Sequence, residues 1–261
     1  MNRHAPLPLD IRLMNMLATT MFVAAVLLAL GAALAWTVRL PLFAIQGVTV
    51  TGDVSHYNAI TLRANVVPRL QGTYFTLDVQ SARKAFETMP WVRQALVRRD
   101  FPNRIKVQLQ EHQAVAFWGP EGDMRLVNSF GEVFEANVGE LDQEYMPRLT
   151  GPDGYSAQML EMYRLLQPMY ASRDLNIEQL ERTARGGWRA KLESGTALEL
   201  GSASAADMLA RSEGFLKTMT EVTARYGRTP VQLQSVDLRH SDGYAIRLDG
   251  VRTLVDDIKK Q

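Results

Sequence analysis

Residues 89–107 read MPWVRQALVRRDFPNRIKV, and this stretch predicts two strands joined by a tight turn. After the turn, apolar and polar residues alternate, with Ile105 and Val107 on one side of the chain and Arg104 and Lys106 on the other. The turn contains Asp, Pro and Asn, which favour tight turns. We therefore expect a β-hairpin with one apolar face and one basic face.

The residues before this hairpin predict the rest of a small α/β domain. Alternation over 48–51 predicts a first strand. A short helix is expected over 60–67, and Asp78 is expected to cap a second helix that ends at Pro90. The predicted order is strand, helix, helix, strand, strand, and these elements can close one small core.

An uncharged run of 26 residues, 13–38, lies between Arg12 and Arg39. A helix needs roughly 20 apolar residues to cross a bilayer. A cleaved signal peptide is the alternative, because residues 33–35 resemble a signal-peptidase site, but a signal peptide has an apolar core of only about 7–15 residues. We expect a retained anchor. The small excess of basic residues before this anchor favours a cytoplasmic location of residues 1–12. The bulk of the chain would then lie outside the cytoplasm.

The second half of the chain predicts a larger unit that is richer in strands. Short strands are expected at 115–118, 124–128, 132–134, 177–183, 188–192 and 197–200. Two helices are expected among them. The first presents Met159, Met162, Tyr163, Leu166 and Met169 to the core, and the second, capped by Ser204 with Asp207, presents Met208, Phe215, Met219, Val222 and Tyr226.

The end of the chain predicts a hairpin with an exposed edge. Leu233 and Val236 lie in different phases of alternation, which indicates a bulge near residues 234–235. After a turn, Tyr244, Ile246 and Leu248 alternate with polar or small residues. No later strand follows, so we expect the last strand to leave backbone N–H and C=O groups unpaired.

Composition excludes several classes of function. Hydrophobic residues make up 46% and charged residues 22%, which indicates a folded chain. The 29 basic and 28 acidic side chains leave a net charge of +1, which argues against nucleic-acid binding. There is no cysteine, and the four histidines lack the spacing of a metal pair. Because no catalytic or phosphate-binding motif is present, we expect no enzyme activity, no cofactor and no small-molecule substrate.

Five blocks of the sequence resemble the FtsQ/DivIB cell-division family. FAIQGVTVTG at 43–52 resembles the opening of its POTRA domain, and residues 89–107 resemble its most recognisable stretch. Further resemblances lie at Val127-Asn128 with Gly131 and Phe134, at 146–152 and at 236–239, although Asp is common in the family where Asn128 stands. The blocks follow the family's order behind one membrane span, and the resemblance covers about residues 13–250.

The resemblance implies a single N-terminal transmembrane helix followed by α+β domains. Its segments would be a cytoplasmic tail (1–12), the transmembrane helix (13–38), a β-α-α-β-β POTRA domain (43–112), a mixed α/β domain with a largely antiparallel sheet (113–250) and a C-terminal tail (251–261). It further implies a non-catalytic, single-pass inner-membrane scaffold, periplasmic in bulk and enriched at the division septum. Such a scaffold binds FtsB and FtsL, helps control the septal peptidoglycan synthases FtsW and FtsI, and meets upstream division proteins.

The resemblance and the edge strand together predict where FtsB and FtsL bind. We expect a partner strand to add to residues 243–249, with the following residues at the contact: Arg239, His240, Gly243, Tyr244, Ala245, Ile246, Arg247 and Leu248. Arg239 would meet an acidic group. The alternative is that the apolar side chains only pack inward. A proline at Ala245 is expected to block pairing if its N–H faces outward. His240 and Leu248 stand where some relatives carry Tyr and Trp.

The densest basic cluster has two interpretations. It consists of Arg93, Arg98, Arg99, Arg104 and Lys106. It can be a solvated hairpin face, or a docking face for an acidic partner or for lipid headgroups, and its four arginines are our expected recruitment face. Two other classes of protein also remain open. One is a membrane-anchored POTRA-type module for outer-membrane assembly or secretion, and the other is a tethered cell-wall enzyme.

Overall fold

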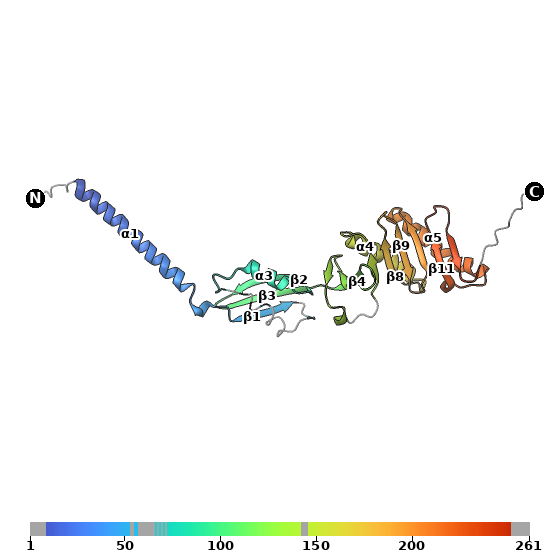
Figure 1. Cartoon of the computed structure of the whole chain (residues 1–261), viewed down its shortest axis with the longest axis horizontal. Helices are drawn as coiled ribbons and strands as arrows, with labels where there is room; N and C mark the ends of the chain where they lie inside the picture. Colours follow the sequence, from blue (N-terminus) through green and yellow to red (C-terminus); the bar gives the residue numbers. More distant parts are fainter. Residues whose placement is uncertain are drawn as a thin grey trace, which may run out of the picture. The chain divides into compact units, whose positions relative to one another are not determined.

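The chain divides between Glu111 and His112 into two units. The computed structural model describes residues 9–52, 55–56, 66, 68, 70, 72–141 and 146–251. In Figure 1 the first unit runs from α1 to β3, and the second begins at β4. The two buried clusters of apolar side chains share no residue. Each unit is therefore stabilised by its own packing.

The N-terminal helix α1 (Leu9–Thr37) is long and apolar enough to cross a membrane. It has 29 residues and a mean hydropathy of 2.3, and none of its side chains is buried. In the part of the chain that the structure describes, it is the one helix with these properties. It starts before the uncharged run because Asp10 lies in its first turn, where the helix dipole favours a negative charge.

The first unit contains a three-stranded sheet covered by a helix. Its elements are η1 (Pro41–Phe43), β1 (Gly47–Gly52), α3 (Val79–Glu87), β2 (Val92–Asp100) and β3 (Arg104–Glu111). The strand order is β1-β3-β2, with β1 parallel and β2 antiparallel to β3. The predicted hairpin and first strand are confirmed. The helix expected over 60–67 lies outside the described residues, except for the buried Val66.

Alternation in the hairpin decides which face of the first sheet is buried. Ile105, Val107 and Leu109 are at most 2% exposed and face α3, while the even-numbered residues of β3 up to Gln110 face solvent. The helix begins where predicted, because the Asp78 side chain accepts a hydrogen bond of 2.9 Å from the backbone N–H of Gln80.

The second unit is built on one sheet of nine strands and two long helices. The strands are β4 (Ala114–Trp118), β5 (Arg125–Asn128), β6 (Val133–Glu135), β7 (Arg148–Thr150), β8 (Ile177–Arg182), β9 (Trp188–Leu192), β10 (Ala197–Gly201), β11 (Leu233–Asp237) and β12 (Ala245–Leu248). The helices are α4 (Ser156–Ala171) and α5 (Ala205–Arg225), with short turns η3 (Val138–Glu140) and η4 (Pro230–Gln232). The strand order is β12-β11-β10-β9-β8-β7-β4-β5-β6. Most neighbours are antiparallel, as expected for a mixed α/β domain.

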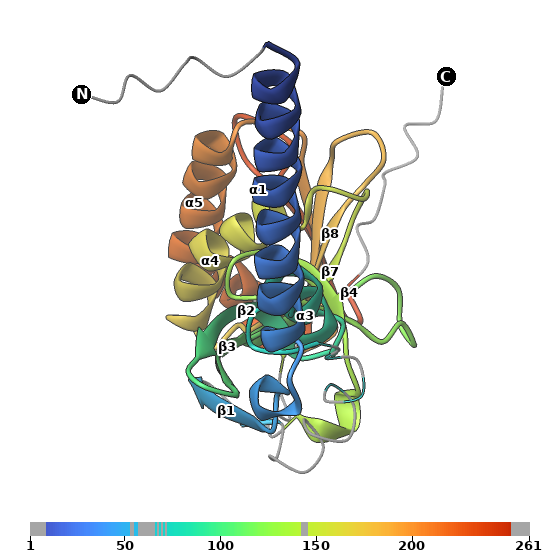
Figure 2. The same ribbon diagram turned by 90° about the vertical axis from the view of Figure 1, so that its left-hand side faces the viewer.

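Both long helices are crossovers between adjacent parallel strands. Helix α4 connects β7 to β8, and α5 connects β10 to β11. Both crossovers step in the same direction across the sheet, and such connections are nearly always right-handed. The helices must then cover the same face, and Figure 2 shows α4 and α5 on one side of the sheet. Among the described residues of the second unit, α4 and α5 are the only α-helices.

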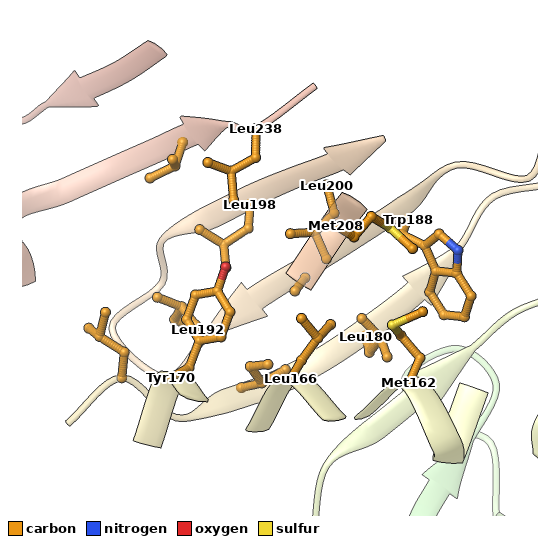
Figure 3. Close-up of a cluster of buried hydrophobic side chains, with 14 of the residues drawn as sticks. Met162, Leu166, Tyr170, Leu180, Trp188, Leu192, Leu198, Leu200, Met208 and Leu238 are labelled. Carbon is orange, nitrogen blue, oxygen red and sulfur yellow. The ribbon is translucent and has the colours of Figure 1, made fainter. Parts of the chain in front are cut away.

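The core of the second unit lies between these helices and the sheet. Figure 3 shows Met162, Leu166 and Tyr170 projecting from α4 toward side chains of the strands. The buried hydroxyl of Tyr170 donates to Ser212 Oγ on α5 over 3.1 Å, and burial raises the pKa of Tyr170 to about 12. The predicted core role of Met159 and Met162 is confirmed.

The predicted apolar face of the second helix is partly wrong. Met208, Phe215 and Met219 are buried, but Tyr226 is 58% exposed and Thr223 is buried in its place. Tyr226 is the residue after the last turn and has left the helical conformation (φ −100°, ψ 10°), so helical spacing no longer decides where its side chain points.

Candidate interaction surface

Strand β12 forms one end of the nine-stranded sheet and pairs with β11 alone among the described strands. The antiparallel register joins Asp237 to Ala245, Val236 to Ile246, Ser235 to Arg247, and Leu233 to Leu248. The pairing shifts between Leu233 and Ser235, which confirms the predicted bulge. The predicted C-terminal hairpin and its edge position are therefore present.

The backbone of β12 points alternately toward β11 and toward the open edge. The N–H of Asp249 donates to the carbonyl of Gln232 over 3.1 Å. In an antiparallel pair every second residue points its N–H and C=O toward the partner strand. Ala245 and Arg247 therefore face β11, whereas Ile246 and Leu248 face the open edge. A proline at Ala245 would block pairing only if the N–H of Ala245 faced outward, and this N–H faces β11. Ile246 is therefore the position that tests the edge.

The side chains of β12 fix the strand to the core without using its edge. Leu248 is 5% exposed, and Ile246 and Tyr244 are half-buried against the same cluster. The Tyr244 ring packs edge-on against Phe215 of α5, with centroids 5.2 Å apart, and its hydroxyl lies 2.7 Å from Thr218 Oγ1. This face thus packs inward, while no other strand of the described residues pairs with the outer backbone edge of β12.

Arg239 lies just beyond β11 and is held by a carboxylate two residues earlier. Its Nε and Nη2 donate to Asp237 Oδ1 over 2.9 Å and to Oδ2 over 2.6 Å. This contact lowers the pKa of Asp237 to about 2, against the effect of burial, and raises the pKa of Arg239. Nη1 lies outside this pair, so Arg239 keeps donors that can reach an acidic group.

Asp237 is expected to titrate normally once Arg239 is replaced. In Arg239→Gln, we expect the pKa of Asp237 to rise from about 2 toward 3.8, as measured by NMR of its carboxyl carbon. Because the folded-state pKa is the lower one, the pair contributes stability above about pH 4 and loses it as the pH falls toward 2. Arg239 is 59% exposed, so this contribution should be below about 1 kcal/mol.

Asp123 is a control within the same chain, since Arg125 holds it at the same two-residue spacing and lowers its pKa. Its titration should not change in Arg239→Gln. An Asp237 titration that is the same with and without Arg239 would contradict the assigned contact.

The loop before β12 is exposed but anchored at its start. His240 and Gly243 are exposed. Arg211 of α5 donates through Nη1 to the carbonyls of Leu238 and Arg239, each over 2.9 Å. Arg211 is not among the residues that the sequence singles out, since it is 27 and 28 residues from its two partners. No local spacing indicates such a contact.

The basic residues of the first unit do not share one face. Arg98 pairs with Lys106 and Asp100 with Arg104 on the open face of the sheet. Arg99 points to the other face, where its Nη2 donates to the carbonyl of Leu77 over 2.8 Å. Neighbouring strand residues point to opposite faces, so the adjacent pair Arg98-Arg99 already indicated this division. Arg93 is half-buried and donates to Gln110 Oε1 over 3.2 Å.

Across the described ranges, no group of three or more His, Asp or Glu side chains is placed to hold a metal ion. The buried Glu111 accepts hydrogen bonds from the backbone of Ser55 and His56 and lies 2.8 Å from His56 Nδ1. His56 in turn stacks on Trp91, with centroids 3.8 Å apart. These contacts stabilise the end of β3 and satisfy the buried carboxylate.

Comparison with known proteins identifies both units. The model "POTRA domain, FtsQ-type" matches residues 43–112, and the model "Cell division protein FtsQ/DivIB, C-terminal" matches residues 116–239. The second match ends at Arg239 and so does not include β12. The expected fold class is confirmed: an N-terminal apolar helix, a POTRA domain and a mixed α/β domain.

Whole-length relatives agree with the two domain matches. Cell division protein FtsQ of Thiomonas arsenitoxydans is 37% identical over 255 residues, which cover 96% of this chain and 93% of the relative. FtsQ of Burkholderia pseudomallei is 37% identical, covering 95% and 96%, and FtsQ of Bordetella pertussis is 33% identical, covering 92% of each. The chain therefore belongs to the FtsQ family of cell division proteins.

Proposed function

We propose that the chain is a non-catalytic scaffold of the division machinery that binds FtsB and FtsL through the open edge of β12. The observation that carries the proposal is the register of β12, which turns the N–H and C=O groups of Ile246 and Leu248 away from β11. A partner strand can pair with these groups, as in β-strand addition. Membership of the FtsQ family supports partners from the division machinery.

Arg239 is proposed to receive an acidic side chain of the partner. Asp237 already accepts hydrogen bonds from the guanidinium of Arg239 and neutralises part of its charge. A carboxylate of the partner would bind the same guanidinium as a second acceptor. Arg211 holds the carbonyl of Arg239 and keeps this residue close to the edge strand. The exposed His240 and Gly243 would lie beside the partner, whereas Ala245 and Arg247 would contribute only their exposed side chains.

The proposed cellular setting follows from α1 and the flanking charges. The segment before the membrane helix, residues 1–12, carries Arg3 and Arg12, whereas after Arg39 no Lys or Arg follows until Arg63. This difference favours a cytoplasmic location of residues 1–12. The chain would then be a single-pass inner-membrane protein with its two domains in the periplasm, enriched at the septum. Through FtsB and FtsL it would help control peptidoglycan synthesis by FtsW and FtsI.

Binding to the two partners tests the proposal. The full chain in lipid nanodiscs should bind the soluble periplasmic parts of FtsB and FtsL saturably, as measured by calorimetric titration. Binding to neither part would contradict the proposal. Release of muropeptides from isolated cell walls by the same preparation would favour the tethered cell-wall enzyme instead.

Charge reversal on the open face of the first sheet should impair localisation but preserve folding. Arg98 lies directly opposite Lys106, so Arg98→Glu replaces a like-charge pair by an ion pair that contributes about 0.2–1 kcal/mol. We expect this variant to fold and to bind FtsB normally. A fluorescent fusion of the variant should lose its enrichment at the septum in cells depleted of the unaltered protein.

Lys84→Glu is the matched control for this reversal. Lys84 is exposed on α3, on the other side of the sheet, and its replacement makes the same change in charge. Localisation should survive in the control. Loss of FtsB binding in Arg98→Glu would show that recruitment and FtsB binding are assigned to the wrong faces.

A further inference from the structure

A group of exposed apolar side chains lies where α1 joins the first sheet. Leu42 is 68% exposed, Phe75 47% and Phe101 67%. They come from three separate segments: η1, the loop before α3 and the turn between β2 and β3. With the half-buried Phe43 and Tyr74 they form a surface that we call the juxtamembrane patch.

The aromatic rings of the patch are in continuous contact. The centroids of Phe43 and Phe75 lie 5.0 Å apart, those of Tyr74 and Phe75 5.1 Å, and those of Tyr74 and Phe101 5.6 Å, all edge to face. Exposed apolar side chains that cluster in this way mark interaction surfaces more often than isolated ones do. The rings therefore present one shared surface.

Hydrogen bonds hold the patch beside the end of the membrane helix. The Thr73 hydroxyl donates to the carbonyl of Val38 over 2.8 Å, and Val38 directly follows α1. The N–H of Tyr74 donates to the carbonyl of Phe43 over 2.7 Å, and the N–H of Gln46 donates to the carbonyl of Asn103 over 2.9 Å. The loop and the hairpin turn are thus both fixed to the few residues that leave the helix.

We propose that the juxtamembrane patch inserts into the headgroup region of the bilayer that holds α1. Aromatic side chains are favoured at this depth, and an apolar surface typically enters it by about 5–10 Å. Two exposed cations adjoin the patch: Arg39 follows the helix, and Arg104 follows the turn that carries Phe101. Each can attract the headgroup of an anionic lipid. The proposal rests on α1 being a membrane anchor, but not on FtsB or FtsL binding.

A chain without cysteine allows a direct test. Phe75→Cys in the full chain, labelled with an environment-sensitive fluorophore, is placed in nanodiscs that contain phosphatidylglycerol and lipid-attached quenchers. We expect quenching by the lipid and several-fold lower quenching by iodide than for the same label at Gln94→Cys. Gln94 is exposed at the opposite end of the same hairpin.

Replacing the remaining exposed apolar residues shows whether the patch causes the effect. In Phe75→Cys with Leu42→Ser and Phe101→Ser, the label should become accessible to iodide. Equal accessibility at Phe75→Cys and Gln94→Cys in the otherwise unaltered chain would overturn the proposal. Protection that appears only after FtsB and FtsL are added would also overturn it, and would make the patch a protein-binding site.

Discussion

Replacing Ile246 by proline is expected to weaken binding of FtsB by about 10- to 100-fold, because two effects act together. The substitution removes an N–H that faces the open edge, and a net hydrogen bond contributes about 0.5–1.5 kcal/mol. The ring also occupies the space through which a partner strand approaches. Calorimetric titration of the full chain in nanodiscs measures the change.

Two controls separate the edge from the rest of the strand. Arg247→Ala removes only an exposed side chain of β12 and leaves its backbone groups in place, so it should weaken FtsB binding far less than Ile246→Pro does. Ala245→Pro removes an N–H that faces β11, so it should loosen β12 and lower the free energy of unfolding together with affinity. A folded Ile246→Pro chain that binds FtsB with unchanged affinity would contradict pairing at this edge.

Ile246→Pro removes the Ile246 side chain as well as its N–H donor. A backbone-methylated chain separates the two effects. The last residues of the chain can be made as a synthetic peptide that carries an N-methyl group on the backbone nitrogen of Ile246, and this peptide can be joined to the rest of the chain. This change keeps the half-buried side chain and removes only the donor. Binding should fall as in the proline variant, and normal binding would reject the proposed role of this donor.

The sequence predicts the edge strand but not the direction of its backbone groups. Alternation of Tyr244, Ile246 and Leu248 tells which side chains face the core, and the structure confirms that face. The N–H groups lie in the plane of the sheet, so their direction depends on which side β11 occupies. The hydrogen bond from the N–H of Asp249 to the carbonyl of Gln232 gives this direction, so Ile246 rather than Ala245 is the residue whose N–H faces the edge.

The parallel pairings in the second unit are also hidden from local patterns. Strand β7 has only three residues, too few for alternation to be recognised. The sequence predicts strands on both sides of α4 and α5, but a helix between strands does not reveal which strands become neighbours. By contrast, the hairpin of β2 and β3 was predictable because its pairing is local and its turn is explicit.

The sequence proposes candidate binding residues but does not reveal the contacts that hold them. Arg239 is predicted to face a partner, but its anchoring by Arg211 depends on how α5 packs across β11 and is not visible in the local sequence. The four arginines of the first unit failed as a single face for a simpler reason: Arg98 and Arg99 are neighbours on one strand.

Replacing Phe215 by alanine is expected to destabilise the second unit by about 3–5 kcal/mol, the usual cost of removing a buried phenylalanine ring. Phe215 is 0% exposed in the middle of α5 and forms the surface against which Tyr244 packs edge-on. The cavity would therefore lie between the crossover helix and the residue that precedes β12. Native-state hydrogen exchange of the amides in β9 to β11 measures the loss in this unit alone.

The same substitution should also affect the proposed binding edge, because Tyr244 packs against Phe215. Without the Phe215 ring, the hydroxyl contact of Tyr244 with Thr218 is left to hold the start of β12, so amide exchange there should accelerate and FtsB affinity should fall. Tyr226→Ala is the matched control, because that ring lies 58% exposed at the end of the same helix and its loss should change stability by less than about 0.5 kcal/mol. A folded Phe215→Ala chain with normal exchange at β12 and normal FtsB binding would mean that α5 does not position the edge, and β11 alone would then have to hold it.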